Sequence, residues 1–223
     1  MNIATQPIID ISEKTIFAYE VLARNSSKNE FSPPPPNHIF WGLIDCQALQ
    51  LAACSLQLAD KMLFDKPHII TNISEATLAD DRLFAQWSLV ARSRMAKNTL
   101  SIEITEQVSD NTLAHRWKQL KSLGVKIALD DFDQENSSLA RLQNYDWDIA
   151  KFEVDLPTGF SDYQMVGIEE CAGRGITMIA ERIENKQQAL TAKDAGLILQ
   201  QGFLWAHPEI VTAQMPIVDK ISA

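Results

Sequence analysis

The sequence contains few residues that could cross-link the chain or bind zinc. It has three cysteines in 223 residues, and Cys46 and Cys54 lie in a segment with helical spacing. Eight helical residues would separate their Cα atoms by roughly 12 Å, which is too far for a disulfide. Cys171 has no neighbouring cysteine, and the four histidines show no HxxxH or CxxC-type spacing. We therefore expect neither a disulfide nor a structural zinc site.

Long apolar runs and an excess of basic residues are also absent. No apolar run approaches the roughly 18 to 20 residues of a membrane helix, and residues 1–6 lack a basic stretch followed by an apolar one. These absences predict a cytoplasmic protein without a membrane span. The 20 basic side chains are outnumbered by 29 acidic ones, for a net charge of −9. Since binding to long nucleic acid depends on Lys and Arg, this balance excludes that partner class but allows a small anion held through metal ions.

The composition is that of a folded chain. Hydrophobic residues make up 46% of the sequence, which is enough for a large core. Single-domain α/β barrels commonly reach this length. We therefore expect one domain over residues 1–223.

Short β-like runs alternate with helix-length segments along most of the chain. An extended pair at 6–11 and 17–24 is followed by a stiff loop at 33–36 and a helical region at 37–64. Such alternation predicts a parallel sheet crossed by helices. The later β-like runs occupy 68–74, 99–105, 125–132, 147–154, 175–181 and 197–205.

Each later β-like run carries one polar residue in its middle or toward its end. Strands covered on both faces should be nearly wholly apolar, so this recurrence needs a cause. Side chains that recur once per strand–helix unit converge on one rim of a (β/α) barrel, whereas an open sheet would spread them along a line. The pattern therefore favours a barrel. The residues are Asn72, Glu103, Asp130, Lys151, Glu181 and Gln201, with Glu20 in the second extended run.

The carboxylates of this set, together with Asp131, would repel one another at neutral pH without cations. Oxygen ligands of this kind select Mg²⁺, Mn²⁺ or Ca²⁺. With Lys151 beside them, metal-assisted hydrolysis of a phosphate ester is the leading chemistry. Two alternatives stay open at this point. Each acid could simply cap a helix or pair with a cation such as Lys126, Lys151 or Arg182, or the barrel could be a lyase or isomerase that stabilises an enolate through Mg²⁺.

Eight short motifs also resemble a known family. QPIIDI, YEVLAR, TNIS, IEITE, IALDDF, AKFE, AERIE and QGFLWAHP occur in the order and approximate spacing of the EAL domain family, the bacterial cyclic di-GMP phosphodiesterases. The resemblance runs from Gln6 to Pro208. It implies a modified TIM barrel, (β/α)8, whose first strand is antiparallel to the rest. It also implies hydrolysis of cyclic di-GMP to linear pGpG with two Mg²⁺ or Mn²⁺ ions.

The resemblance also assigns roles by position. It implies that Glu106 stabilises the loop after the Asp-Asp pair. It further implies ligands for the two metal ions and a set of catalytic residues, and some residues belong to both sets. The metal ligands are Glu20, Asn72, Glu103, Asp130, Asp131 and Glu153. The catalytic residues are Glu20, Lys151, Glu181 and Asp131. The residues expected to bind the dinucleotide are Gln6, Leu22, Arg24, Gln201 and Arg182.

The chain departs from the family pattern around this site. Val21 replaces Ala in the signature triplet, which leaves Glu20 untouched. Asp133 and Glu135 stand where active members have glycines, Glu153 replaces Asp, and Arg182 replaces Gly. These changes are consistent with a slow enzyme. The alternative is a degenerate EAL domain that acts as a cyclic di-GMP receptor or a protein-interaction module. The resemblance further implies a homodimer and a sensory or effector protein partner.

Overall fold

The computed structural model describes residues 2–27, 30–32, 34, 40–59, 68–94, 99–133, 138–155 and 159–211. Most of the proline-rich loop at 33–36, and residues 134–137 after the Asp-Asp pair, lie outside the described residues. Within the described residues, no helix combines the length and the apolar character needed to cross a bilayer.

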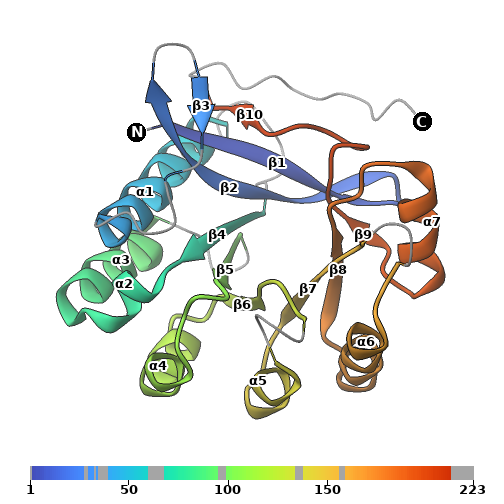
Figure 1. The fold of residues 1–223 in the computed structure, drawn as a ribbon. Coiled ribbons are helices and arrows are strands. Elements are labelled where there is room, and N and C mark those ends of the chain that lie inside the picture. The colour runs from blue at the N-terminus through green and yellow to red at the C-terminus, as the bar shows by residue number, and fades with distance from the viewer. Residues whose placement is uncertain are drawn as a thin grey trace.

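Eight strands close into a barrel (Figure 1). Closure comes from β1, which pairs antiparallel with both β2 and β9. The remaining neighbours, from β2 and β4 through to β8 and β9, pair in parallel. The predicted barrel with an antiparallel first strand is therefore confirmed. The barrel strands are β1 (Asn2–Asp10), β2 (Thr15–Ser27), β4 (Ile69–Ile73), β5 (Leu100–Ile104), β6 (Lys126–Leu129), β7 (Ile149–Glu153), β8 (Thr177–Glu181) and β9 (Leu199–Gln200).

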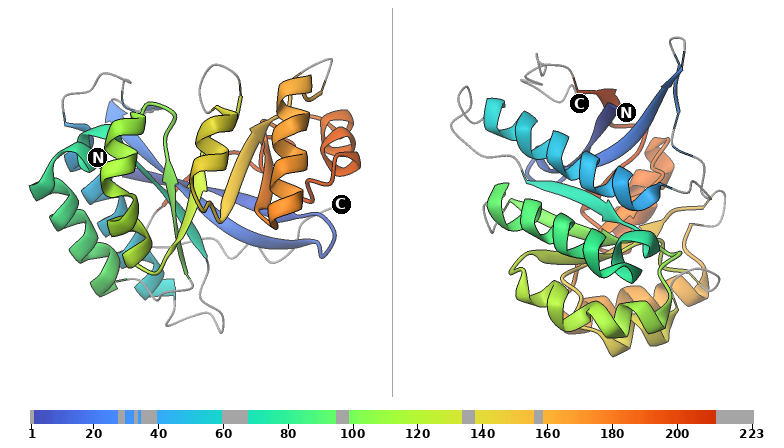
Figure 2. Two further views of the ribbon diagram at one scale, coloured as in Figure 1. Left: turned by 90° about the horizontal axis from the view of Figure 1, so that it is seen from below. Right: turned by 90° about the vertical axis from the view of Figure 1, so that its left-hand side faces the viewer.

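Helices surround most of this barrel, and two short strands extend it. In Figure 1 the helices lie around the left, lower and right sides of the barrel, while β1 and β2 cross its upper side, and Figure 2 shows the same arrangement from below and from one side. The short strands β3 (Glu30–Ser32) and β10 (Glu209–Ile210) pair with β2 and β1. The helices are α1 (Trp41–Ala59), α2 (Glu75–Ala79), α3 (Asp81–Arg94), α4 (Asp110–Ser122), α5 (Leu139–Asn144), α6 (Asp162–Arg174) and α7 (Lys186–Asp194).

The barrel interior has an apolar floor. Because side chains alternate between the two faces of a strand, one residue of each pair points into the barrel. The inward residues near the amino ends of the parallel strands form a cluster of their own, separate from the main core. Burial of this layer excludes water from beneath the polar layer above it. Its members are Ile8, Ala18, Ile70, Ala128, Ile149, Ile179 and Leu199.

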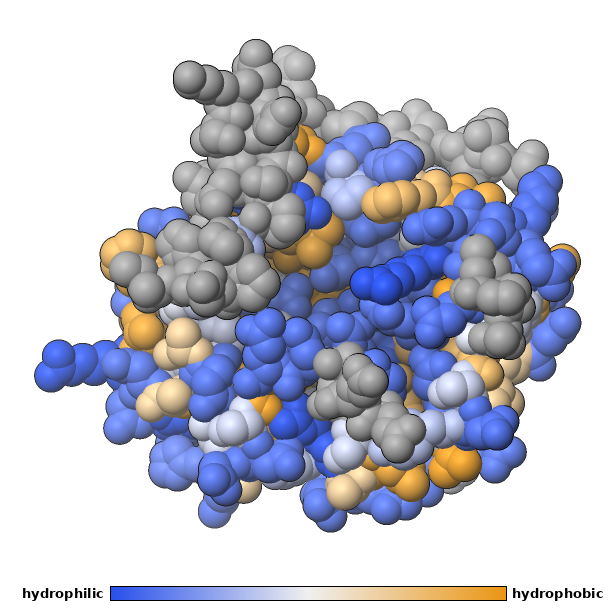
Figure 3. Space-filling model, in the orientation of Figure 1, coloured by the Kyte–Doolittle hydropathy of each residue, from blue (hydrophilic) through white to orange (hydrophobic). Residues whose placement is uncertain are grey.

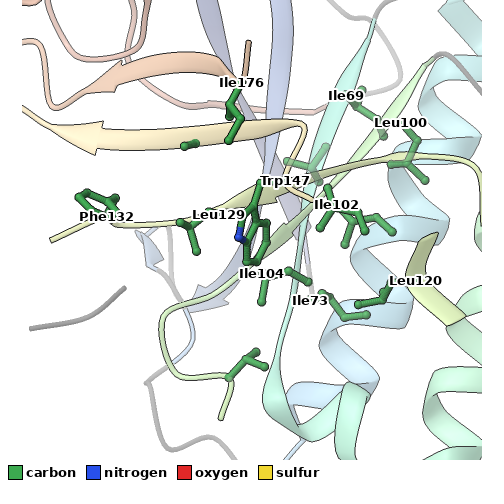
Figure 4. Packing of buried hydrophobic residues seen from close by; sticks show 14 of the residues in the cluster. Ile69, Ile73, Leu100, Ile102, Ile104, Leu120, Leu129, Phe132, Trp147 and Ile176 are labelled. Atoms are coloured by element: carbon green, nitrogen blue, oxygen red, sulfur yellow. The ribbon is translucent and has the colours of Figure 1, made fainter. Parts of the chain in front are cut away.

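The outward strand residues form the larger core between the barrel and the helices. Ile102 and Ile104 of β5 and Leu129 of β6 are fully buried there. In Figure 4 they lie near Trp147, which is 4% exposed. The indole nitrogen of Trp147 donates to the Arg141 carbonyl at 3.0 Å, so this aromatic residue is buried with its polar atom satisfied. This outer core fixes each strand against its helix and so fixes the direction of the inward side chains.

The strands lie where the sequence predicts them, with one correction. The run at 197–205 was expected to be a single strand, but β9 ends at Gln200 and 203–205 form a turn. The reason is Gly202, at which φ is +155°. A Cβ there would lie 2.1 Å from the carbonyl oxygen of Ile183. The chain therefore bends against residue 183, and the amide of Leu204 donates to the Ile183 carbonyl at 2.9 Å.

Candidate active site

One polar layer lies directly above the apolar floor. Each of its residues is two positions from a floor residue, or from buried Ser101 in β5, so the strand period of two brings them to the same level. In antiparallel β1 the polar residue precedes its floor residue, as Gln6 precedes Ile8. The carboxyl ends of parallel barrel strands are where active sites lie. The layer consists of Gln6, Glu20, Asn72, Glu103, Asp130, Lys151, Glu181 and Gln201.

These residues line a cavity of about 520 Å³, called the acidic basin below. Figure 3 shows this face of the molecule hollowed and largely hydrophilic at its centre. Three of the lining residues, Glu184, Gly202 and Phe203, were not predicted from the sequence. The signal for them was present, since they belong to the AERIE and QGF motifs. The lining beyond the polar layer consists of Asp131, Glu153, Arg182, Glu184, Gly202 and Phe203.

Lys151 lies at the centre of the inner basin, by which we mean the part of the acidic basin formed by Lys151 and its partners Glu20, Glu103, Asp130 and Glu181. Its side chain is 2% exposed, and its Nζ lies 2.7 Å from a Glu181 oxygen and 2.9 Å from a Glu103 oxygen. Glu20 and Asp130 follow at 3.7 and 3.8 Å. A single buried ammonium is therefore shared by four carboxylates, and it cannot balance their charge if all four are ionised.

Two amides fix the orientation of Glu20. Asn72 Nδ2 donates to Glu20 Oε1 at 3.2 Å, and Gln201 Nε2 donates to Glu20 Oε2 at 2.5 Å. Gln201 also donates to Gln6 Oε1 at 3.3 Å, and Gln6 donates to the Ala206 carbonyl at 3.0 Å. This chain of amides connects three strands and holds one carboxylate in a defined position.

The carboxyl groups of the basin have raised pKa values. Burial raises the pKa of Glu103 to about 7 and that of Glu181 to about 8, although Lys151 opposes both shifts. Burial and the neighbouring carboxylates raise the pKa of Asp130 well above its usual value. Burial alone would lower the pKa of Lys151, but its four acidic neighbours raise it well above its ordinary value. The basin thus combines a charged lysine with carboxyl groups that keep their protons to unusually high pH.

A second cluster of acidic side chains lies beside the carboxylates that surround Lys151. Asp131 has a positive φ of 44°, which turns it away from the direction of β6. It forms a cluster with Glu106 and Asp130 in which one oxygen from each lies within 4.8 Å of the others. Glu153 approaches Asp131 closely enough for a hydrogen bond between their side chains, and burial together with Asp131 raises its pKa to about 7. Arg182 pairs with Glu153, with Nε 2.7 Å from Oε1.

The donor set fits a divalent cation. Within the described chain, Glu103 Oε2 and Gln201 Oε1 are buried and have no hydrogen-bond partner. An unpartnered buried oxygen is costly unless a ligand completes its interactions. Carboxylate and amide oxygens are the ligands that Mg²⁺ and Mn²⁺ prefer.

Most of the residues singled out in the sequence come together here, and two do not. Leu22 and Arg24 lie further along β2 and are not among the residues that line the basin. Arg24 is half-buried, its Nη1 donates to the Ala23 carbonyl at 2.9 Å, and burial lowers its pKa. Their predicted contact with a ligand stays a prediction.

The chain is a closed barrel with a polar, oxygen-rich cavity at the carboxyl ends of its parallel strands. Among such barrels, it belongs to the EAL domain family, whose model matches residues 1–208. The family assignment made from the eight motifs is therefore confirmed.

Relatives with known sequences are distant and longer. The chain is 27% identical over 215 residues to the uncharacterized protein YuxH of Bacillus subtilis strain 168, covering 94% of this chain and 48% of YuxH. It is 27% identical over 195 residues to the cyclic di-GMP phosphodiesterase PdeA of Borreliella burgdorferi, covering 79% of this chain and 29% of PdeA. The chain thus spans about half of one relative and under a third of the other.

Solved structures agree in fold. An EAL domain protein from Listeria monocytogenes EGD-e has a TM-score of 0.75 at 21% identity, over 93% of this chain and 88% of that one. Klebsiella pneumoniae BlrP1, in a complex with manganese and cyclic di-GMP, has a TM-score of 0.73 at 21% identity, over 94% of this chain and 56% of that one. At these identities the agreement concerns the fold.

Proposed function

We propose that this chain is a metal-dependent phosphodiesterase that hydrolyses cyclic di-GMP to linear pGpG. The observation that carries the proposal is the layer of oxygen donors around buried Lys151 at the carboxyl ends of the strands. Membership of the EAL family supports it, as do relatives and structural neighbours named for cyclic di-GMP hydrolysis or binding.

The proposed metal ligands fall into two groups. Glu20, Asn72, Glu103 and Asp130 would hold one Mg²⁺ or Mn²⁺ ion, and Asp131 with Glu153 would hold a second beside it. Bound divalent ions supply Lewis-acid activation of the phosphate and of the attacking water. Asp130 lies near both groups. Like Glu20 and Glu103 of the first group it lies within 4 Å of Lys151, at 3.8 Å, and it also clusters with Asp131 of the second group.

The other residues position the reactants and control protons. Lys151 would orient the attacking water, and Glu181, whose Oε1 lies 2.7 Å from Lys151 Nζ, would keep that ammonium in place. Gln6 and Gln201 would contact the ligand from the β1 side, and Arg24 and Leu22 would contact it above the basin. Arg182 offers a guanidinium suited to a phosphate. Glu106, which clusters with Asp130 and Asp131, would stabilise the loop after the Asp-Asp pair.

A second candidate function is a cyclic di-GMP receptor without turnover. The observation that favours it is the Arg182–Glu153 ion pair, which ties up one of the proposed metal ligands. The exchange of two family glycines for Asp133 and Glu135 points the same way, although Glu135 lies outside the described residues.

Measuring turnover distinguishes the two candidate functions, enzyme and receptor. Purified protein is incubated with cyclic di-GMP and Mn²⁺ or Mg²⁺, and pGpG is followed by chromatography. The proposal expects pGpG from the wild type and none from Glu20→Ala, with both proteins folded by circular dichroism. Tight binding without product would replace the enzyme by the receptor. Neither binding nor product would leave a protein-interaction module.

The loop after the Asp-Asp pair offers a second test. If its missing glycines limit turnover, Asp133→Gly combined with Glu135→Gly should raise the rate of pGpG formation. An unchanged rate would discard the loop as the limiting feature. The homodimer, the protein partner, the cytoplasmic location and the extent of the single domain over 1–223 stay predictions from the sequence.

A further inference from the structure

Arg182 has an unusual backbone conformation at the edge of the acidic basin. It follows the last residue of β8 and has a positive φ of 55°, a region that residues other than glycine rarely adopt. Left-handed backbone is strained in such a residue, because its Cβ approaches the following carbonyl oxygen. A residue kept there against that strain is a candidate for a functional role.

The surrounding backbone prevents Arg182 from relaxing. The Glu181 carbonyl accepts from the Val154 amide at 3.2 Å, and the Ile183 amide donates to the Gln201 carbonyl at 3.1 Å. Gly202 packs directly against the backbone of Ile183. Residue 182 is therefore held between two anchored neighbours, and its side chain leaves the turn in a fixed direction.

The Arg182 guanidinium lies against the outer carboxylates. Its Nε is 2.7 Å from Glu153 Oε1, and Glu153 is in turn close to Asp131. Lys151, by contrast, forms its ion pairs with Glu20, Glu103, Asp130 and Glu181. The described basin is thus divided between two side-chain cations, one buried among the inner carboxylates and one, 67% exposed, beside the outer pair.

We propose that Arg182 is a built-in counter-cation that competes with a divalent ion for Glu153 and Asp131 and so weakens the outer of the two metal positions. The proposal rests on the metal requirement in the proposed function. An ion entering the outer position has to displace the guanidinium from Glu153 and then stay beside a permanent positive charge. The inner position lies beside Lys151 instead, so the charge of Arg182 bears on the outer position.

The size of the effect follows from exposure. A partly exposed ion pair contributes up to about fivefold to a binding constant, or about 1 kcal/mol. The outer Mn²⁺ position of the wild type should therefore bind about fivefold more weakly than it does without this charge. Removing the charge of Arg182 should strengthen one Mn²⁺ constant by about that factor and leave the other unchanged.

The test is a Mn²⁺ titration without nucleotide, followed by calorimetry and by the electron paramagnetic resonance signal of free Mn²⁺. Arg182→Gln removes the charge at nearly the same length and Arg182→Lys keeps it. Arg92→Gln removes an exposed arginine whose side chain contacts Ser122 instead. Arg182→Gln should bind one of its two ions about fivefold more tightly than the wild type does, while Arg182→Lys and Arg92→Gln should behave like the wild type. Thermal melts in EDTA establish that all variants are folded.

Two results would overturn the inference. One is an Arg182→Gln variant with the wild-type constants, and the other is an Arg92→Gln variant with the same gain in Mn²⁺ affinity as Arg182→Gln. These outcomes leave the proposed function intact if pGpG is still formed. A wild type that binds no Mn²⁺ would overturn the inference and the proposed function together. A gain in Mn²⁺ affinity confined to Arg182→Gln, without turnover in any variant, would retain the inference and leave the receptor as the function.

Discussion

At the scale of single residues, the main feature of the basin is that four carboxylates lie around one ammonium group. Lys151 lies within 4 Å of all four and is almost completely buried. Removing one partner from a buried ion pair leaves an uncompensated charge, whereas a surface pair contributes little. The stability of the ion-free protein should therefore depend on Lys151 far more than on an exposed lysine.

Lys151→Met tests this dependence. We expect the free energy of unfolding in EDTA near pH 8 to fall by roughly 3–5 kcal/mol, since the remaining carboxylates lose their cation. Mn²⁺ should restore more stability to this variant than to the wild type. Denaturant titration with and without Mn²⁺ gives both quantities. Lys118→Met, on the exposed side of α4, should change stability by no more than about 0.5 kcal/mol. Equal stability of Lys151→Met and the wild type in EDTA would refute the shared-cation description.

The raised carboxyl pKa values give a prediction with a definite sign. Glu103 and Glu181 have pKa values of about 7 and about 8 in the folded protein, against 4.5 ordinarily. Between these limits the folded state binds more protons than the unfolded chain, so stability in EDTA falls as the pH rises. A divalent ion replaces those protons. The rise in melting temperature on adding Mn²⁺ should therefore be larger near pH 8.5 than near pH 6. A rise of the same size at both pH values would contradict these shifts.

At the scale of elements, α6 fixes the segment that carries Asp131. Phe132 is buried, stacks on Tyr163 of α6 at 5.5 Å and contacts Phe152 at 5.3 Å between ring centres. Beyond the loop, the Leu139 amide donates to the Tyr163 hydroxyl at 2.6 Å. One helix thus holds the chain on both sides of residues 134–137, and Gly167 of the same helix gives Phe132 its space.

Gly167→Ala should disturb this contact. A Cβ at residue 167 would lie 2.2 Å from the Phe132 ring, so the ring and the adjacent Asp131 must shift. We expect a loss of about 1–3 kcal/mol in stability and weaker Mn²⁺ binding. Denaturant unfolding and a Mn²⁺ titration measure the two effects.

Gly173→Ala is the matched control for this helix. Nothing lies within 4 Å of a Cβ at residue 173, and alanine has the better helix propensity, so the variant should be as stable as the wild type or more stable by up to about 1 kcal/mol. If the two alanine variants behave alike, the close contact between α6 and Phe132 does not control the site.

Much of the site could be predicted because strands have a fixed period. Ile70 and Asn72, or Ile149 and Lys151, show the two-residue step from floor to polar layer directly in the sequence. The Arg182–Glu153 pair could not be predicted, because it depends on a positive φ and a particular side-chain direction. The packing of Gly167 on Phe132 was equally hidden, since it depends on how α6 lies across the barrel. The expected strand at 197–205 was too long because the bend at Gly202 depends on its close contact with the Ile183 backbone, a tertiary contact that the local sequence does not reveal.

At the scale of the whole molecule, the net charge of −9 has a structural explanation in part. Several of the acidic residues are gathered at one end of the barrel rather than spread over the surface, among them Glu20, Glu103, Asp130, Asp131 and Glu181. A divalent ion in the basin would neutralise these carboxylates toward an anionic dinucleotide. We therefore expect the proposed enzyme and the proposed receptor to share a dependence on such an ion.

The most direct test of this account is a calorimetric titration of cyclic di-GMP into the wild type, once with Mn²⁺ and once with EDTA. The account predicts a saturable binding signal with Mn²⁺ that is lost in EDTA and in Glu103→Gln, whose carboxylate belongs to the inner basin. Binding of equal strength with Mn²⁺ and with EDTA, or no binding in either, would contradict the claim that the acidic basin holds the dinucleotide through a metal ion.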